Sequence, residues 1–497
     1  MDKIKLIAKP GKSVATLFAA FSEKADLGDL SSKETWGKLG GGDLVELSDC
    51  HPPYPIPVGS SSEGRGFAAR FMLSRIKYVE GREALKTAAA EAWKLARKLK
   101  VDRVVLLLDG EQGKDWVKAA AEGVALAAYE YTDGKGSARK VSKQRLKAEI
   151  LLAGTASKSV QSGVDEALSL AKWTNLARDL VNTPPSEMNP TALADQAKKV
   201  AAAHGSLTCR IMNDAALRKA GYNGVAMVGQ GSVTPPCMIV LHYKPTKTVK
   251  GVHLALVGKG VTFDTGGYCI KPARDMWKMK GDMAGGAAVV AAMGAIAEMK
   301  LPVEVTGIVP AACNAVDAKA MLPGDIIRTA NGKTVQIDNT DAEGRLLLMD
   351  ALQEAARLKA SHAVDIATLT GSAANALGPA MAAVFTDEDS WAARIDASGS
   401  AAGEMFWRLP LHAEYAEMLK CEAADLNNTG NSPRAGAITA ALFLKEFVDP
   451  KMTWAHLDIA GTFMLDKPWR YLGAGGTGFG VRTFVELVRS FALHPKV

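Results

Sequence analysis

The chain has 497 residues, 48% of them hydrophobic and 23% charged, a composition that excludes a disordered or fibrous protein. Its length exceeds that of one ordinary hydrophobic core, so two or three domains are expected. The net charge of +7 is dispersed among acidic residues, as in "REALKTAAAEAWKLARKLK", and without a basic stripe it does not predict a nucleic-acid partner.

The start of the chain, "MDKIKLIAKPGKS", lacks the apolar core of a signal peptide. Six cysteines are scattered without a CxxC pair, which fits a reducing compartment. The most apolar segment, residues 283–299, is too short and too rich in Gly and Ala to span a membrane. We therefore expect a cytoplasmic protein without a membrane partner.

The first third of the chain alternates helix and strand signals. Residues 83–100 place apolar side chains on one helical face, and the apolar run "RVVLLLDG" at 103–110 is typical of a strand. A second helical pattern, near 162–180, ends in "VNTPPSEMNP", whose paired prolines stop a helix. We place the domain boundary near the start of that helix. This predicts an N-terminal α/β domain over 1–165, followed by a linker helix and a C-terminal domain over 166–497.

Strands and helices alternate again in the second domain. Two helical candidates are "MAGGAAVVAAMGAIAEM" (283–299) and "LLLMDALQEAARLKA" (346–360). The expected strands are apolar, β-branched runs that end in polar or glycine-rich turns: 238–243, 252–260, 303–311, 363–371 and 454–461. This alternation predicts an α/β fold in which each of the two domains has a mixed, mostly parallel sheet flanked by helices. In such folds ligands bind beyond the carboxyl ends of the strands.

Charged residues gather in two of those turns. The first turn carries Lys259, Asp264, Lys271, Lys280 and Asp282, and the second carries Asp341, Glu343 and Arg345. If the four carboxylates converge, their repulsion needs compensation, and a divalent cation is the strongest compensation available. Their oxygens would suffice for two ions, and a neutral Lys259 amine could join them because a dication favours the uncharged form. No HExxH motif occurs, so a metal site would be built on carboxylates.

Each of these residues also has an ordinary explanation. Asp282 precedes one helical segment, and Asp341 and Glu343 precede another, so all three could be helix N-caps. The "GKG" around Lys259 lacks the spacing of a phosphate loop and by itself is a turn. Lys271 alone would be a surface lysine. Spacing by itself leaves the metal site and the capping interpretation open.

Several segments resemble blocks of the M17 family, the leucyl (cytosol) aminopeptidases. They are "NTPPSEMNP", "VGKGVTFDTGGYCIKP", "MKGDMAGGAAV", "NTDAEGRL", "DIATLTG", "HLDIAG" and "GTGFGVR", in the family's order. The resemblance covers about residues 165–485, and "NTDAEGRL" is complete. The first 160 residues carry no comparable motif and are compatible with the family's variable N-terminal domain, with a possible oligomeric or regulatory role.

The resemblance implies a site for two divalent metal ions per subunit, zinc or manganese. The tighter ion would be held by Lys259, Asp264, Asp282 and Glu343. The more exchangeable ion would be held by Asp264, Asp341 and Glu343, so that Asp264 and Glu343 bridge. By the same resemblance, Lys271 would stabilise the oxyanion. Arg345 would bind a bicarbonate ion that serves as general base.

The resemblance also implies which residues bind substrate. The side-chain pocket and the substrate backbone would be contacted by Met279, Asn339, Thr368, Leu369, Gly371 and Ala460, with Phe463 as a further candidate. An apolar lining suits Leu-like or Met-like N-terminal residues. "Asn431-Ser432-Pro433" stands where the family commonly has a glycine-rich turn, so the side-chain preference is open.

The expected function is therefore a metal-dependent aminopeptidase acting on short peptides. Family members assemble as hexamers, so a homohexamer is the expected oligomer. Two other activities stay open at this point. One is hydrolysis of dipeptides such as Cys-Gly, and the other is a DNA-binding or scaffolding role of the kind some bacterial relatives have.

Overall fold

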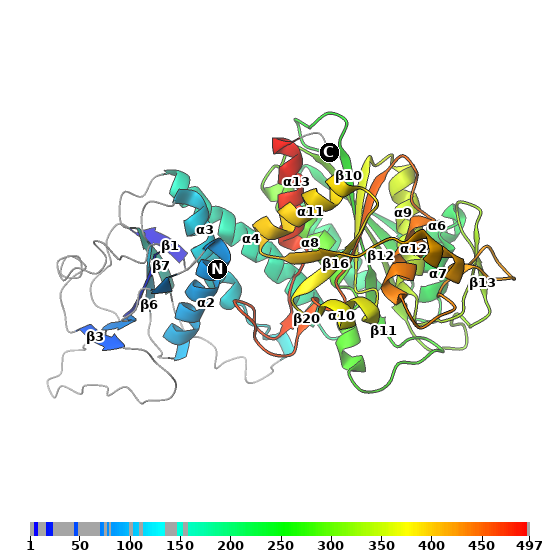
Figure 1. Ribbon diagram of the computed structural model, residues 1–497, viewed down its shortest axis with the longest axis horizontal. Helices are drawn as coiled ribbons and strands as arrows, with labels where there is room; N and C mark the ends of the chain where they lie inside the picture. Colours follow the sequence, from blue (N-terminus) through cyan, green and yellow to red (C-terminus); the bar gives the residue numbers. More distant parts are fainter. Residues whose placement is uncertain are drawn as a thin grey trace. The chain divides into compact units, whose positions relative to one another are not determined.

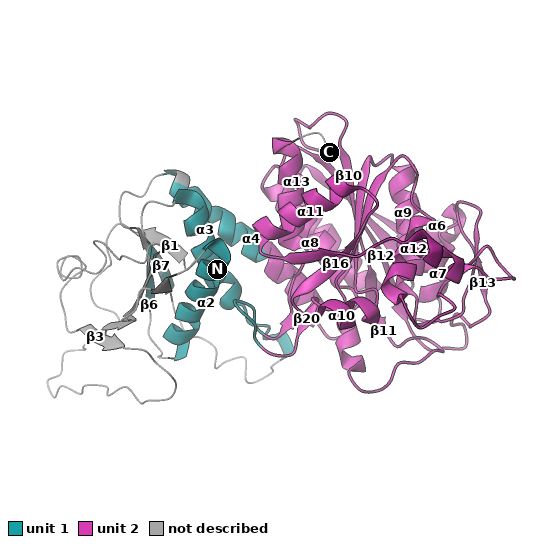
Figure 2. Cartoon of the chain, in the orientation of Figure 1, with its two compact units in different colours: residues 1–172, 468–473 teal, residues 173–467, 474–497 magenta. Residues whose placement is uncertain are grey.

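The computed structural model describes residues 4–7, 16–22, 44–47, 70–73, 77–78, 81–98, 103–108, 113–134, 147–152 and 158–494. The chain divides into two compact units (Figure 2). Unit 1 comprises residues 1–172 and 468–473, and unit 2 comprises 173–467 and 474–497. The division falls inside helix α4 (Lys158–Asn182), the helix near whose start the sequence suggested a boundary. The return of 468–473 to unit 1 was not foreseen.

The described part of unit 1 contains a parallel sheet, two complete helices and the first part of α4. The strand order is β1-β7-β6-β2-β4-β3, with β5 beside β2, and every described pairing is parallel. The strands are β1 (Ile4–Ile7), β2 (Thr16–Ser22), β3 (Leu44–Leu47), β4 (Arg70–Leu73), β5 (Lys77–Tyr78), β6 (Arg103–Leu108) and β7 (Lys147–Leu152). Helices α2 (Gly81–Lys98) and α3 (Gly113–Ala127) pack together, with a buried ion pair between Lys86 and Glu122.

Unit 2 is built on a mixed nine-stranded sheet. Its order is β17-β16-β19-β15-β10-β12-β9-β8, with β11 beside the end of β12. The central strands β19, β15, β10 and β12 run parallel. Antiparallel pairing joins β9 to β12 and β8, and β16 to β19, whereas β17 is parallel to β16. The strands are β8 (Leu207–Asn213), β9 (Cys237–Tyr243), β10 (His253–Gly258), β11 (Gly260–Asp264), β12 (Glu304–Asn314), β15 (His362–Ala367), β16 (Met381–Phe385), β17 (Met405–Arg408) and β19 (Thr453–Asp458).

Two small sheets and nine α-helices complete the described part of unit 2, beyond the end of α4. The small sheets contain β13 (Ile326–Arg328), β14 (Thr334–Gln336) and β18 (Leu426–Asn427), and β20 (Met464–Leu465) and β21 (Gly475–Gly476). The helices are α5 (Pro190–Ala202), α6 (Asp214–Ala220), α7 (Asn223–Gly229), α8 (Ala284–Glu298), α9 (Gly344–Arg357), α10 (Gly371–Leu377), α11 (Asp389–Ala402), α12 (Gly436–Lys445) and α13 (Val481–Leu493), with 3-10 helices η4 (Met276–Gly281) and η5 (Ala413–Leu419).

Helices cover both faces of the large sheet, which confirms the expected fold class. Figure 1 shows α8 and α13 to one side of β10 and β12, and α7, α9 and α12 to the other. The buried core on the α9 side joins Leu348 and Leu352 to Ala255, Val257 and Ile308 of the central strands. No helix among the described residues is both long and apolar enough to cross a membrane.

The glycine-rich start of α8 lets this helix approach the sheet very closely. A Cβ on Gly285 would lie 2.0 Å from the Ile366 carbonyl oxygen, and one on Gly258 would lie 2.5 Å from the Gly285 carbonyl oxygen. Neither space admits a methyl group. The segment that the sequence marked as a buried Gly/Ala helix therefore brings Asp282, just before it, against the carboxyl ends of the strands.

The sequence predicted a single strand over 252–260, and that prediction was wrong in one respect. The run breaks at Lys259, between β10 and β11. Lys259 donates its backbone N–H to Ile366 and accepts from Gly286, so its backbone bonds outward to β15 and α8. Because the strand is interrupted here, the Lys259 side chain does not follow the alternation of side chains between the two faces of the sheet. It lies at the carboxyl edge of the sheet, where ligands bind in such folds.

Candidate metal centre

The charged residues singled out in the sequence come from separate elements and meet at one edge of the large sheet. Lys259 follows β10 and Asp264 ends β11. Asp282 lies between η4 and α8, and Asp341 and Glu343 lie just before α9. The folding of β10 and β11 beside β12, with α8 and α9 packed on these strands, is what brings the two turns together.

Lys259 lies at the centre of one half of the cluster. Its Nζ is 2.8 Å from a carboxylate oxygen of Asp282 and 2.8 Å from Oε1 of Glu343. It also donates to the Thr368 carbonyl at 2.9 Å. Lys259, Asp282 and Glu343 are all at most 5% exposed, so this is a desolvated group of charges rather than a surface ion pair.

Lys271 lies at the centre of the other half of the cluster. Its Nζ is 2.8 Å from Asp264 Oδ2 and 2.5 Å from Asp341 Oδ1. Single carboxylate oxygens of Asp264, Asp341 and Glu343 lie within 4.8 Å of one another, a spacing that could hold a metal ion. Asp264 Oδ1, the oxygen that does not face Lys271, accepts hydrogen bonds from the Gly266 N–H and the Asn314 side chain, each at 2.8 Å.

The capping interpretation is not supported for the helices that follow these acids. Helix α8 has Met283 at its N-cap, and α9 has Glu343, and neither helix has a side-chain capping hydrogen bond. The Asp282 carboxylate instead accepts from the Thr368 hydroxyl at 2.7 Å, and Asp341 faces Lys271. The carboxylates therefore point into the shared cluster and not back along their own helices.

Burial and mutual repulsion set the pKa values of the cluster in the metal-free chain. Burial opposes the charge of Lys259, but Asp282, Glu343 and Asp264 outweigh it and raise the Lys259 pKa. Lys271 behaves similarly, because Asp264 and Glu343 raise its pKa against burial. Burial and the neighbouring Asp264 raise the pKa of Asp341 to about 6. The two lysines thus act as counter-ions for the carboxylates, whose mutual repulsion would otherwise prevent all of them from being ionised together.

The donor set fits hard or borderline divalent cations. Asp282 Oδ2, Asp341 Oδ1 and Glu343 Oε1 are buried and accept no well-aligned hydrogen bond from the described residues, although a lysine lies beside each. Carboxylate oxygens suit manganese and zinc, and a lysine that loses its proton adds a nitrogen ligand. Lys259, Asp264, Asp282, Asp341 and Glu343 are the side chains that could hold such ions.

Arg345 lies on the first turn of α9, beside this cluster, and is 7% exposed. Its Nη1 donates to the Asn428 carbonyl at 2.7 Å, and its Nε has no hydrogen-bond partner among the described residues. Burial lowers the Arg345 pKa to about 10, and Glu343 and Asp458 partly offset this. The guanidinium therefore remains charged at neutral pH and keeps donor capacity for an anion.

The residues expected to bind substrate lie around the cluster, and two of them also support it. Thr368 bonds to Lys259 and Asp282 through its carbonyl and hydroxyl. The Asn339 side chain accepts from the Asp341 N–H at 2.8 Å. The Leu369 and Ala460 N–H groups both donate to Asp458 Oδ1, at 3.2 and 3.1 Å. Asp458 therefore holds the Leu369 and Ala460 backbones in place.

Met279 and Gly371 are the remaining residues for which the sequence predicts substrate binding. Met279 lies within η4, and Gly371 opens α10 directly after Thr370, whose hydroxyl caps that helix. A Cβ on Gly281 would lie 2.7 Å from the Phe463 ring, so Phe463 packs directly on the turn that carries Met279.

Three polar residues that the sequence did not single out organise the site. Asn314 positions Asp264, and Asp458 fixes the 369–370 backbone. Asn428 accepts from Asp338 and Asn339 N–H groups and donates to the Asn339 carbonyl. Asp458 lies within the predicted strand 454–461 and is the last residue of β19, so its position in a strand could have marked it. Asn428 lies in an irregular segment, and no local signal marks it.

Comparisons with known proteins agree with this geometry. The family model described as "Cytosol aminopeptidase family, catalytic domain" matches residues 175–485. A probable cytosol aminopeptidase of Solibacter usitatus (strain Ellin6076) is 43% identical over 425 residues, 85% of each chain. One of Roseiflexus castenholzii (strain DSM 13941 / HLO8) is 42% identical over 415 residues, 82% of this chain and 84% of the relative.

Two solved structures are similar over nearly the whole chain. The bottromycin maturation enzyme BotP in complex with Mn has a TM-score of 0.80 and 34% identity, covering 97% of this chain and 100% of that one. A mutant of tomato leucine aminopeptidase has a TM-score of 0.80 and 30% identity, covering 98% and 96%. Sequence family, relatives and fold agree with a carboxylate cluster suited to divalent ions, and the chain belongs to the M17 cytosol aminopeptidases, a family of metal-dependent exopeptidases.

Proposed function

We propose that the cluster binds two divalent ions, zinc or manganese, and releases the N-terminal residue from short peptides. Asp264 and Glu343 would bridge the ions, Lys259 and Asp282 would complete one site, and Asp341 the other. The observation that carries this is the convergence of four carboxylates on two lysines, one buried and one partly exposed. When bound, such a pair of ions acidifies water and polarises a carbonyl.

Lys271 would stabilise the oxygen of the scissile carbonyl as it becomes negative. Its Nζ lies between Asp264 and Asp341, at the open side of the cluster, where an ammonium group can face the developing charge. Its side chain is 20% exposed, compared with 4% for Lys259. The two lysines therefore divide the roles: the buried one as ligand, the accessible one as oxyanion partner.

Arg345 would hold a bicarbonate ion that acts as general base. Two features support this role: a buried guanidinium with an unused Nε donor, and a carbonyl partner in place of a carboxylate. Glu343 and Asp458 act on Arg345 only from a distance, and no described carboxylate forms an ion pair with it, so the guanidinium can pair with a diffusible anion. A planar oxyanion matches the fork of the guanidinium.

The preferred N-terminal residue would be Leu-like, in a pocket near Met279, Asn339, Thr368, Gly371 and Ala460. The chain would work in the cytoplasm as a homohexamer. The names of its relatives support the location, and the family resemblance supports the oligomer. Sedimentation of purified protein tests the oligomer, and an active monomer would contradict it.

The test of function is hydrolysis of leucine-p-nitroanilide by native, chelator-stripped and metal-restored protein. We expect loss of activity on stripping, recovery with zinc or manganese, and no release from the N-acetylated substrate. Lys271→Ala should reduce kcat with little change in KM. Lys278→Ala, on η4 and paired with Asp275 and Asp466, is the matched control and should leave kcat unchanged. Equal activity on the blocked substrate would refute an exopeptidase.

A further inference from the structure

A second group of metal-binding side chain types lies on the large sheet, away from the carboxylate cluster. It consists of His242 on β9, His253 on β10 and Glu304 on β12. The register pairs His253 with Glu304, and His242 with Thr306, two residues further along β12. Side chains two apart on a strand share a face, so all three project from the same face of adjacent strands.

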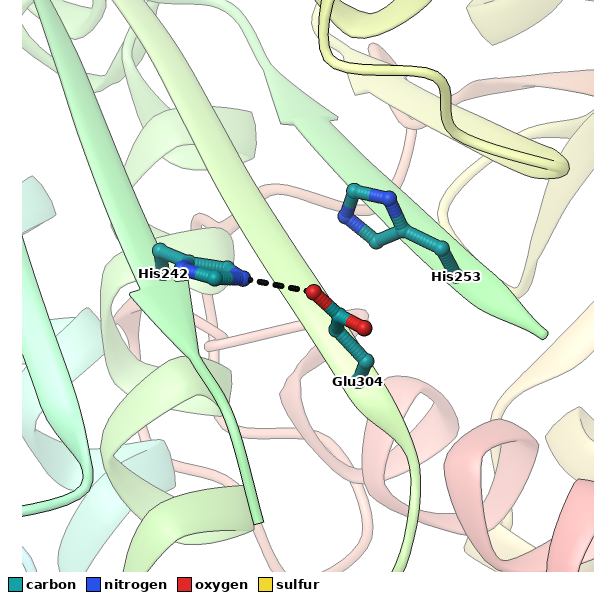
Figure 3. A group of neighbouring side chains, drawn as sticks. All are labelled: His242, His253 and Glu304. Atoms are coloured by element: carbon teal, nitrogen blue, oxygen red, sulfur yellow. Dashed lines mark hydrogen bonds and ion pairs between the residues drawn. The ribbon is translucent and has the colours of Figure 1, made fainter. Parts of the chain in front are cut away.

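The side chains point toward a common space, as Figure 3 shows, with the two rings on either side of the Glu304 carboxylate. His242 Nε2 is 2.9 Å from Glu304 Oε1, and the two ring centroids are 6.1 Å apart. One ligand atom from each residue lies within 4.8 Å of the other two. All three residues are partly buried, so the group is both shielded and reachable.

The bonds around His253 place the lone pair of Nε2 beside the Thr306 hydroxyl, which a metal ion would displace. Its Nε2 lies 2.9 Å from the Thr306 hydroxyl, and the ring also has a hydrogen bond to the backbone of Lys359. With Nε2 beside Thr306, Nδ1 is the nitrogen available for that backbone acceptor. A histidine whose second nitrogen is anchored to a backbone carbonyl is the usual arrangement of a metal ligand.

This group is separate from the carboxylate cluster. His253 opens β10, and Lys259 follows its last residue, so at about 3.3 Å per strand residue the two sites lie about 20 Å apart. The group also lies at the amino end of the parallel strands, whereas the carboxylate cluster lies at their carboxyl end. An ion at one site therefore cannot share ligands with the other.

We propose that His242, His253 and Glu304 bind one divalent transition-metal ion of the zinc type. Two imidazole nitrogens and one carboxylate form a ligand set that zinc accepts, with water in the fourth position. Tetrahedral zinc with bonds of about 2.0–2.1 Å needs its ligand atoms about 3.4 Å apart. The His242–Glu304 distance is already shorter than this, so the site is completed when His253 Nε2 exchanges the Thr306 hydroxyl for the ion.

A bound ion would tie three strands together at the point where the sheet changes direction. Strand β12 is parallel to β10 and antiparallel to β9. The ion would bridge both kinds of pairing and stabilise the folded state by mass action. Its role is structural or regulatory, since the aminopeptidase centre lies elsewhere.

The experiment compares zinc content among full-length variants equilibrated with zinc buffered in the low micromolar range. Wild type and His412→Ala, an exposed histidine outside the group, should hold one zinc ion more per chain than His253→Ala and Glu304→Gln. The result is the difference in zinc content per chain between variants, so it does not depend on how many ions the catalytic centre binds. Equal zinc content in all four proteins would overturn the proposal.

Cobalt(II) gives a second readout that is independent of activity. Wild type loaded with cobalt should show a visible absorption band that arises from low-symmetry coordination of the ion at this group. We expect Glu304→Gln to lose this band and His412→Ala to keep it. Glu304→Gln preserves side-chain shape and serves if His253→Ala does not fold, as judged by circular dichroism in chelator. A band of equal intensity in Glu304→Gln would also overturn the assignment.

Discussion

At the residue scale, Glu343 and Arg345 are neighbours in sequence with different predicted roles. Glu343 contacts Lys259 inside the cluster, whereas Arg345 contacts Asn428 beside it. We expect Glu343→Ala to lose bound metal and reduce activity to background. Arg345→Ala should keep its metal and lose about 10²-fold in kcat, the usual contribution of general-base catalysis. Metal analysis alongside kinetics separates them, and equal metal loss in both variants would undermine the assigned roles.

The protonation of Lys259 gives a second residue-scale prediction. Three carboxylates keep this lysine charged without metal, so it must release a proton to become a ligand. We expect metal binding near neutral pH to release at least one proton more from wild type than from Lys259→Met. Calorimetric titrations in buffers of different ionisation enthalpy measure this number. The same proton count in both proteins would show that Lys259 stays an ammonium and is no ligand.

The charged residues could be predicted because they are dense in two short segments, whereas their supports could not. Asp341 and Glu343 stand in one complete motif, and Lys259 and Asp264 in another. Asn428 reaches the same place from an irregular segment 85 positions beyond Glu343. Its side-chain oxygen accepts from two backbone N–H groups, and its carbonyl accepts from Arg345. No pattern in the surrounding sequence indicates these bonds. Only the folded chain shows the contact.

At the element scale, the close contact of α7 with α9 depends on a glycine and a buried acid. A Cβ on Gly224 would lie 2.2 Å from the Leu346 carbonyl oxygen. Asp350 of α9 is 0% exposed, and its Oδ2 accepts from the Val225 N–H at 2.9 Å. The periodicity of 346–360 predicted the helix but not this polar contact. The spacing of apolar residues does not show that Asp350 is buried or that it accepts a hydrogen bond from another helix.

Asp350 gives a prediction for stability against pH. Burial raises its pKa well above the usual value, and two backbone N–H groups only partly offset this. The folded chain then keeps a proton that the unfolded chain loses above about pH 4, so this residue makes stability fall as pH rises. Relative to wild type, Asp350→Asn should gain up to about 1.4 kcal/mol per pH unit above that point. Urea unfolding from mildly acidic to neutral pH measures the difference, and a constant difference would mean that Asp350 is already ionised.

At the scale of the whole molecule, the sequence predicted two α/β units but not how the chain divides between them. Residues 468–473 belong with unit 1 although both flanking segments belong to unit 2. Hydrogen bonds hold residues 468–473 in unit 1: Lys94 donates to the Arg470 carbonyl, and the Tyr471 hydroxyl donates to Glu83. Both bonds link residues more than 370 positions apart. Hydrophobic periodicity describes neighbours in sequence and carries no information about such pairs.

This division predicts where metal stabilises the chain. Every proposed ligand of the catalytic ions belongs to unit 2, so manganese should slow amide exchange in α8 and α9 and leave α2 and α3 unchanged. Free ion at 100 times Kd stabilises the binding unit by about 2.7 kcal/mol, or about 100-fold in exchange that requires its unfolding. Hydrogen exchange read by mass spectrometry reports both units in one sample, and Glu343→Ala is the control that should show little protection. Equal protection in α2 and α3 would mean that the two units unfold together, despite their separate sheets.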